Sequence, residues 1–220
     1  DNGLKIVTSS MAHSISIAVN IFVGVGSRYE TPENAGISHL VEHLVFKGTV
    51  TRPSPKDISS LIEGVGGVLN AETEHELTVY WCHVIRQHMD QSIDLLIDML
   101  RNSLFEPDEL ERERLVVFEE QRMVNDYPDQ RVDALMAEML WPNHPLGWDI
   151  CGSRESVGRI TREMVMDHME QFYTPENMVV SVAGDIRHEQ VVDLINPLVA
   201  GWDSRSSPSW RNFSDDQLSP

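Results

Sequence analysis

A His-x-x-Glu-His pattern, formed by His39, Glu42 and His43, constrains this chain more than any other feature of its sequence. In an α-helix, side chains three and four positions apart share a face, so these three project from the same side. The apolar residues around them fall on the opposite side, in a stripe that would face a core. These are Ile37, Leu40, Val41, Leu44 and Val45. The segment therefore predicts a helix that packs on one side and carries polar chemistry on the other.

The polar face of this helix has the composition of a metal site. Two imidazoles at positions i and i+4 can reach a single zinc ion at about 2.0–2.1 Å. We therefore expect His39 and His43 to bind Zn²⁺, with Glu42 near the ion's open position as general base. A solvated helix face is the alternative. It fits less well, because the face has no Lys, Arg or Asp and continues into Phe46.

A catalytic zinc site usually takes three protein ligands, so one more has to come from elsewhere in the chain. We expect it on a helix over residues 107–125, where Glu113 and Glu120 fall within the apolar stripe and Glu119 points elsewhere. The apolar members of that stripe are Leu110, Val116, Val117 and Val124. An ionised carboxylate directed at a core is costly unless it is paired or bound to a metal. Glu120 is therefore the predicted third ligand, and Glu113 the group that holds a histidine or the water in place.

Ion pairing along the same helix is the alternative explanation for these acids. The helix also carries Arg112, Arg114 and Arg122, which could neutralise neighbouring carboxylates. For Glu113 this alternative stays open.

Several separated blocks of the sequence resemble one family of enzymes. They are residues 39–49, 66–73, 113–120, 144–147, 173–177 and 182–185. In this order they resemble the inverted-motif zinc peptidases, which include pitrilysin, insulin-degrading enzyme and the mitochondrial processing peptidase, and most closely the small bacterial processing-peptidase-like members. The resemblance implies peptide-bond hydrolysis with zinc, and a third ligand at the position of Glu120. It also implies two related halves, of which this chain resembles the first.

The order of predicted elements indicates an α+β fold, with helices packed on a largely antiparallel sheet, as one half-unit of a two-domain chain. We expect a catalytic domain over residues 1–202 and a linker or loose chain end over residues 203–220. Strands are predicted within residues 4–28 (two), 68–72, 77–84 and 178–183. Helices are predicted over residues 53–61, 87–101, 107–125, 161–172 and 189–199, with 130–140 as a continuation of the third after an interruption at Tyr127-Pro128.

The predicted substrate is a peptide held in extended form along the strand at 68–73, because main-chain pairing accepts many sequences. Asn70 and Ala71 match the family's substrate-contacting edge. A tight turn feeding a strand is the alternative reading of Asn70, and the better explanation of Gly66 and Gly67. Other partners expected are a second half-domain and an identical or different subunit. Two other functions stay open: a catalytically silent subunit, and a metal-binding module without hydrolysis.

Bulk properties exclude several classes of function. A formal net charge of −18 over 220 residues argues against nucleic-acid binding, and no apolar run approaches the length of a membrane span. The cysteines, Cys82 and Cys151, are too few for a disulfide framework and are expected to be free. The chain opens without a basic start and apolar run, which favours a cytoplasmic location in a bacterium.

Overall fold

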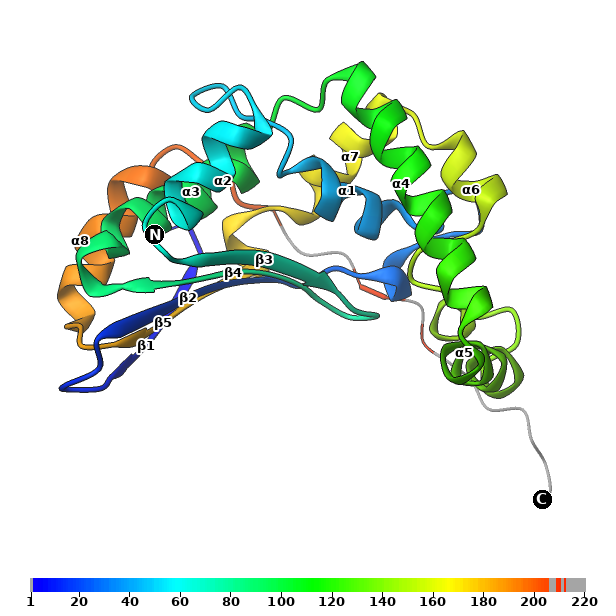
Figure 1. Ribbon diagram of the computed structural model, residues 1–220, viewed down its shortest axis with the longest axis horizontal. Helices are drawn as coiled ribbons and strands as arrows, with labels where there is room; N and C mark the ends of the chain where they lie inside the picture. Colours follow the sequence, from blue (N-terminus) through cyan, green and yellow to red (C-terminus); the bar gives the residue numbers. More distant parts are fainter. Residues whose placement is uncertain (1, 206–208, 211, 213–220) are drawn as a thin grey trace.

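The computed structural model describes residues 2–205, 209–210 and 212, and it is built on one five-stranded sheet (Figure 1). The strand order is β1-β5-β2-β4-β3, in which β1 pairs with β5 in parallel and the other neighbours are antiparallel. The strands are β1 (Lys5–Ser10), β2 (Ser16–Val23), β3 (Val68–Thr73), β4 (Thr78–Ile85) and β5 (Met178–Gly184). The predicted α+β fold with a largely antiparallel sheet is confirmed.

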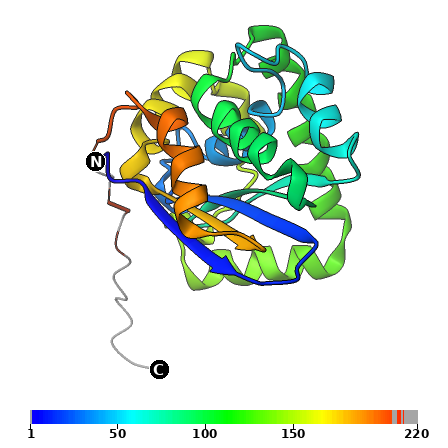
Figure 2. The same cartoon turned by 90° about the vertical axis from the view of Figure 1, so that its left-hand side faces the viewer.

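Helices cover one face of the sheet and leave the other open, as the two perpendicular views show (Figures 1 and 2). The helices are α1 (Ile37–Leu44), α2 (Pro55–Glu63), α3 (Met89–Asn102), α4 (Pro107–Asp126), α5 (Pro128–Leu140), α6 (Arg154–Arg159), α7 (Arg162–Phe172) and α8 (His188–Val199). Every predicted helix and strand is present, and the ends of those predicted with individual bounds differ by at most two residues. Short 3-10 turns cover Ser27–Tyr29, Arg86–His88, Pro145–Gly147 and Pro175–Asn177.

The core lies between the covered face of the sheet and the helices. Strand β2 alternates buried and half-buried positions, so its inward side chains, such as Val19 and Ile21, meet the helical layer. The apolar stripe predicted for α1 is buried, and Leu40 and Val41 are fully enclosed. Burying an aliphatic side chain of this size contributes about 1.5–3 kcal/mol. The same packing that stabilises α1 therefore turns its polar face away from the core.

Helices α4 and α5 are separate at the Tyr127-Pro128 interruption, because Tyr127 precedes Pro128 and takes an extended conformation, with φ −96° and ψ 112°. Two details of the helical region differ from the sequence prediction. Val116 is 42% exposed, so its assignment to the apolar stripe of α4 was wrong. It lies about 100° around the helix from the fully buried Val117. The short helix α6 was not predicted, since six residues are too few to show a period.

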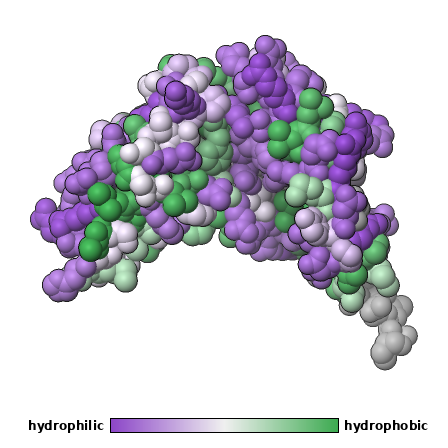
Figure 3. Space-filling view, viewed as in Figure 1, coloured by the Kyte–Doolittle hydropathy of each residue, from purple (hydrophilic) through white to green (hydrophobic). Residues whose placement is uncertain are grey.

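Helix α5 has no buried residue and presents an apolar side to solvent. Apolar surface is visible near it at the right of the space-filling view (Figure 3). Its exposed apolar residues are Val132, Leu135, Met136, Met139 and Leu140. An exposed patch of this kind is typical of a surface that another protein segment covers.

Three further expectations concern the cysteines, membrane-spanning helices and the end of the chain. Cys82 and Cys151 are free thiols, as predicted. In the described part of the chain, no helix is long and apolar enough to cross a membrane. Residues 206–208, 211 and 213–220 of the predicted tail lie outside the described residues, and the domain boundary at residue 202 stays a prediction.

The start of α1 is held by a buried carboxylate that sequence reasoning did not identify. Glu30 accepts hydrogen bonds from the backbone N–H groups of Gly36, at 2.7 Å, and Ser38, at 2.9 Å. Gly36 has φ 93°, a left-handed conformation that favours glycine. Burial raises the pKa of Glu30, against the lowering effect of the two backbone donors. Glu30 therefore fixes the helix that carries the His-x-x-Glu-His residues.

Replacing Glu30 with alanine is expected to lower the free energy of unfolding by about 2–3 kcal/mol, because two buried N–H groups lose their acceptor. Glutamine keeps one acceptor oxygen and should cost less. Urea unfolding monitored by circular dichroism measures the effect, with Glu33→Ala as control, since Glu33 is exposed and near the same helix. An unchanged unfolding midpoint for Glu30→Ala would show that this cap does not stabilise the fold.

Candidate metal centre

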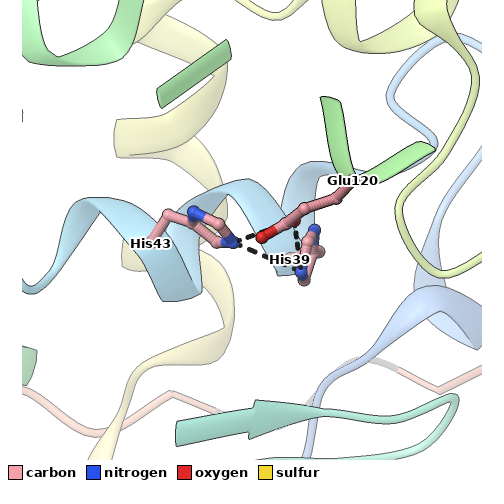
Figure 4. Close-up of side chains that lie close together, drawn as sticks. All are labelled: His39, His43 and Glu120. Carbon is pink, nitrogen blue, oxygen red and sulfur yellow. Dashed lines mark hydrogen bonds and ion pairs between the residues drawn. The ribbon is translucent and has the colours of Figure 1, made fainter. Parts of the chain in front are cut away.

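The structure brings the three predicted metal ligands together (Figure 4). His39 and His43 lie one turn apart on α1, with 3.3 Å between their Nε2 atoms. Glu120 reaches them from α4, and its Oε2 lies 3.7 Å from His39 Nε2 and 3.5 Å from His43 Nε2. Among the described residues, these three offer ligand atoms that all lie within 4.8 Å of one another.

Both the spacing and the burial of these atoms fit a bound cation. Ligand atoms at about 2.0–2.2 Å from a tetrahedral zinc ion are separated by about 3.3–3.6 Å, close to the observed distances. Glu120 Oε2 is buried and, within the described part of the chain, has no hydrogen-bond donor. A buried carboxylate oxygen without a donor is costly, and a metal ion would satisfy it. The two-nitrogen, one-oxygen set matches that of catalytic zinc.

The two imidazoles differ in their electrostatic environment. Burial, followed by the neighbouring His43, lowers the pKa of His39 to about 4. Burial alone would also lower the pKa of His43, but the hydrogen bond with Glu113 and the charges of Glu120 and Glu42 outweigh it, and the pKa is raised. His39 is thus held neutral, which is the form that binds a metal. Its Nδ1 is buried and lacks a hydrogen-bond partner among the described residues.

Glu113 lies where the sequence analysis placed it, beside a histidine. Its Oε2 is 3.1 Å from His43 Nδ1, and its Oε1 is 2.9 Å from Lys47 Nζ. Burial works to raise the pKa of Glu113, but its bonds with His43 and Lys47 dominate and lower it. A carboxylate that accepts a hydrogen bond from Nδ1–H leaves Nε2 free as a metal ligand.

The arginines of α4 do not account for Glu113. Their ion pairs are Arg112–Glu109, Arg114–Glu111 and Arg122–Glu119, each within one turn of the helix. The ion-pairing alternative therefore fails for Glu113. Its cationic neighbour is Lys47, which sequence reasoning missed, although it stands only four positions after His43 in the first of the family-like blocks.

Glu42 is partly buried and is held by a hydroxyl from the sheet. Thr73 Oγ1 donates to Glu42 Oε2 at 2.5 Å. Burial raises the pKa of Glu42, opposed by the Thr73 hydrogen bond and His43 and reinforced by Glu120. A carboxylate with a raised pKa is a better proton acceptor at neutral pH than an ordinary one.

The predicted substrate contacts lie on an edge strand. Within the described residues β3 pairs with β4 alone, so its outer edge is open. Asn70 is exposed and lies inside β3, not in a turn, and its Oδ1 accepts a hydrogen bond from the N–H of Ala71 at 2.9 Å. The turn explanation fits Gly66, which has φ 77°. No recorded hydrogen bond joins Asn70 or Ala71 to the three clustered ligands in the described structure.

Comparison with known families gives two matches along the chain. Residues 5–154 match the family described as Insulinase (Peptidase family M16). Residues 159–219 match the family described as Peptidase M16 inactive domain. The first match contains all the predicted site residues.

Individual relatives agree with the family match. The chain is 38% identical to the uncharacterized zinc protease YmxG of Bacillus subtilis, over 88% of this chain and 47% of that protein. It is 35% identical to the beta subunit of the mitochondrial-processing peptidase of Dictyostelium discoideum, over 88% of this chain and 41% of that protein. The chain therefore spans about half the length of the curated relatives it matches.

Solved structures share the fold. A protease from Helicobacter pylori superposes with a TM-score of 0.87 at 26% identity, covering 96% of this chain and 51% of that one. The periplasmic protease PqqL from Escherichia coli also has a TM-score of 0.87 at 26% identity, covering 97% of this chain and 24% of that one. Family match, sequence identity and fold thus agree, and the chain belongs to the M16 peptidase family.

Proposed function

We propose that this chain carries the zinc site of a metalloendopeptidase, with His39, His43 and Glu120 as ligands and Glu42 as general base. The observation that carries the proposal is the approach of Glu120 Oε2, buried and without a donor in the described structure, to two imidazole nitrogens at 3.5 and 3.7 Å. A carboxylate from one helix and two imidazoles from another, arranged in this way, are suited to share one cation.

The reaction proposed is hydrolysis of a peptide bond by water, without a covalent intermediate. Zinc, when bound, would lower the pKa of a coordinated water and polarise the scissile carbonyl. Glu42 accepts the proton of the attacking water and then donates it to the leaving amine. Glu113 keeps His43 in the tautomer whose Nε2 faces the other ligands, and Lys47 holds Glu113 in turn.

The substrate proposed is an unfolded peptide or presequence, bound in extended form along the outer edge of β3 through Asn70 and Ala71. The open edge provides main-chain donors and acceptors that do not depend on the peptide's side chains. The net charge of −18 is compatible with a basic peptide. One relative is named as a subunit of a processing peptidase, which supports this class of substrate.

A second half-domain, and an identical or different subunit, are proposed as partners because the relatives are about twice as long as this chain. A catalytically silent subunit is the competing function. The complete set of ligands and the adjacent base favour the peptidase. A cytoplasmic location stays a prediction from the sequence.

Zinc content and peptide hydrolysis together test the proposal. The full-length protein is expected to contain about one zinc per chain and to cleave an unfolded peptide, with activity lost on chelation and restored by zinc. Inductively coupled plasma mass spectrometry and a quenched-fluorescence peptide measure the two quantities. A protein with one zinc but no hydrolysis would favour the silent subunit, and a protein without zinc would contradict the proposal.

A further inference from the structure

The hydrogen bond between Thr73 and Glu42 joins two parts of the molecule that have separate roles in the proposed function. Glu42 lies on α1, and Thr73 is the last residue of the edge strand β3. Within the described part of the chain, Thr73 supplies the one hydrogen bond recorded for the Glu42 carboxylate, at 2.5 Å. Thr73 is buried, so water does not compete freely for this contact.

The backbone around Thr73 is held in place from two sides. In the sheet Thr73 lies opposite Thr78, and the hairpin continues with a hydrogen bond from the Glu74 N–H to the Leu77 carbonyl at 2.8 Å. The same hairpin is clamped by the segment before α1, where the Arg28 N–H donates to the carbonyl of His75 at 2.8 Å. The donor is therefore positioned before any substrate arrives.

Close packing reinforces this clamp. Gly26 lies against the hairpin backbone, and a Cβ at that position would stand 2.0 Å from the carbonyl oxygen of Glu74. Only glycine allows the two segments to come so near. The end of β3 and the segment that leads into α1 thus form one rigid unit, with Thr73 and Glu42 on its two sides.

We propose that Thr73 is the positioning residue of the general base: its hydroxyl occupies Glu42 Oε2 and directs the other carboxylate oxygen to the water, and it ties the base to the strand that binds the peptide. The inference rests on the proposed function. A peptide paired with β3 is then fixed relative to the base through a single side chain. Orientation of this kind affects turnover more than substrate binding, because it acts on proton transfer.

Kinetics of the full-length protein test the role. Thr73→Val keeps the shape of the side chain but removes the donor, and it is expected to lower kcat about 10- to 100-fold with KM within about twofold. Zinc content should not change, because the Thr73 hydroxyl bonds to Glu42, which is not one of the three clustered ligands. Thr73→Ser keeps the hydroxyl and should restore kcat to within about threefold of the unmodified protein.

Thr78→Val is the matched control. Thr78 lies directly across the ladder and is fully buried, but its hydroxyl donates to the Val25 carbonyl at 2.9 Å. This variant should lower thermal stability and leave kcat unchanged. If Thr73→Val does not fold, Thr73→Ala replaces it, with the same expected loss of kcat.

Three outcomes would overturn the inference: normal kcat in Thr73→Val, a Thr73→Ser variant as impaired as Thr73→Val, or a loss of zinc that accompanies the loss of turnover. These results differ from failure of the proposed function, in which the unmodified full-length protein would itself lack zinc and hydrolysis. An unmodified full-length protein without zinc and hydrolysis would refute both the proposed function and the positioning role of Thr73. Reduced kcat with normal zinc, rescued by serine, would support the positioning role.

Discussion

Glu42→Gln in the full-length protein is expected to lower kcat for peptide hydrolysis by about 10²–10⁴-fold and to leave zinc content unchanged. Glutamine has the size of glutamate and can still accept the hydrogen bond that Thr73 donates to Glu42. It cannot accept a proton from water. The substitution therefore removes the base and keeps the surrounding geometry, and the kcat of a quenched-fluorescence peptide measures the difference.

The zinc content of Glu42→Gln shows whether Glu42 is a general base or a metal ligand. If Glu42→Gln lost both zinc and activity, Glu42 would belong to the metal-binding groups and the assignment of roles would be wrong. If the variant cleaved the peptide at the normal rate, another group would have to accept the proton. Glu63→Gln serves as control, because Glu63 is an exposed carboxylate at the end of α2 and should have no effect.

Glu120→Gln is expected to weaken zinc binding by more than about 100-fold, since the ion loses its one anionic ligand. His43→Ala should have an effect of the same order. Glu113→Gln should weaken binding by about 10- to 100-fold, because it leaves the ligands in place and removes the group that orients His43. Competition with a chromophoric chelator measures the three affinities.

Glu119→Gln is the matched control for Glu120→Gln. It changes the adjacent residue of α4, whose side chain is 64% exposed and pairs with Arg122. This variant should bind zinc as the unmodified protein does. Equal losses from the two substitutions would indicate a general effect of charge on α4, and normal zinc binding by Glu120→Gln would remove this residue from the ligand set.

Much of the fold could be predicted because local patterns in this chain agree with its tertiary packing. The stripe of α1 has a helical period, and the strand residues of β2 alternate in the period of a sheet. The place of Glu120 beside the histidines was predictable for a related reason: a carboxylate on an apolar stripe is costly, and the family resemblance implies a third ligand at this position. Glu113 followed from the same stripe.

The residues that were missed act through contacts between distant segments. Lys47 and Thr73 meet Glu113 and Glu42 only after α4 and β3 have packed against α1. Glu30 precedes Gly36, the N-cap residue of α1, by six residues, and it carries no pattern that distinguishes a cap from an exposed acid. Such partners depend on tertiary structure, which periodicity does not report.

The apolar residues of α5 show a different limit of sequence patterns, which predict the helix but not what packs against it. Their spacing is that of a helix that packs on a core, and the helix was predicted correctly, but in the described structure the apolar side is exposed. A hydrophobic period predicts that a surface will be covered. It does not tell whether the residues that pack on this surface belong to the same domain or to another segment.

We expect α1 and α4 to share one zinc ion, and an anomalous difference map from zinc-loaded crystals would locate that ion. The expected peak lies about 2.0–2.2 Å from His39 Nε2, His43 Nε2 and an oxygen of Glu120. A zinc peak at another place, such as the Cys151 thiol, with Glu120 turned away from the imidazoles, would contradict it.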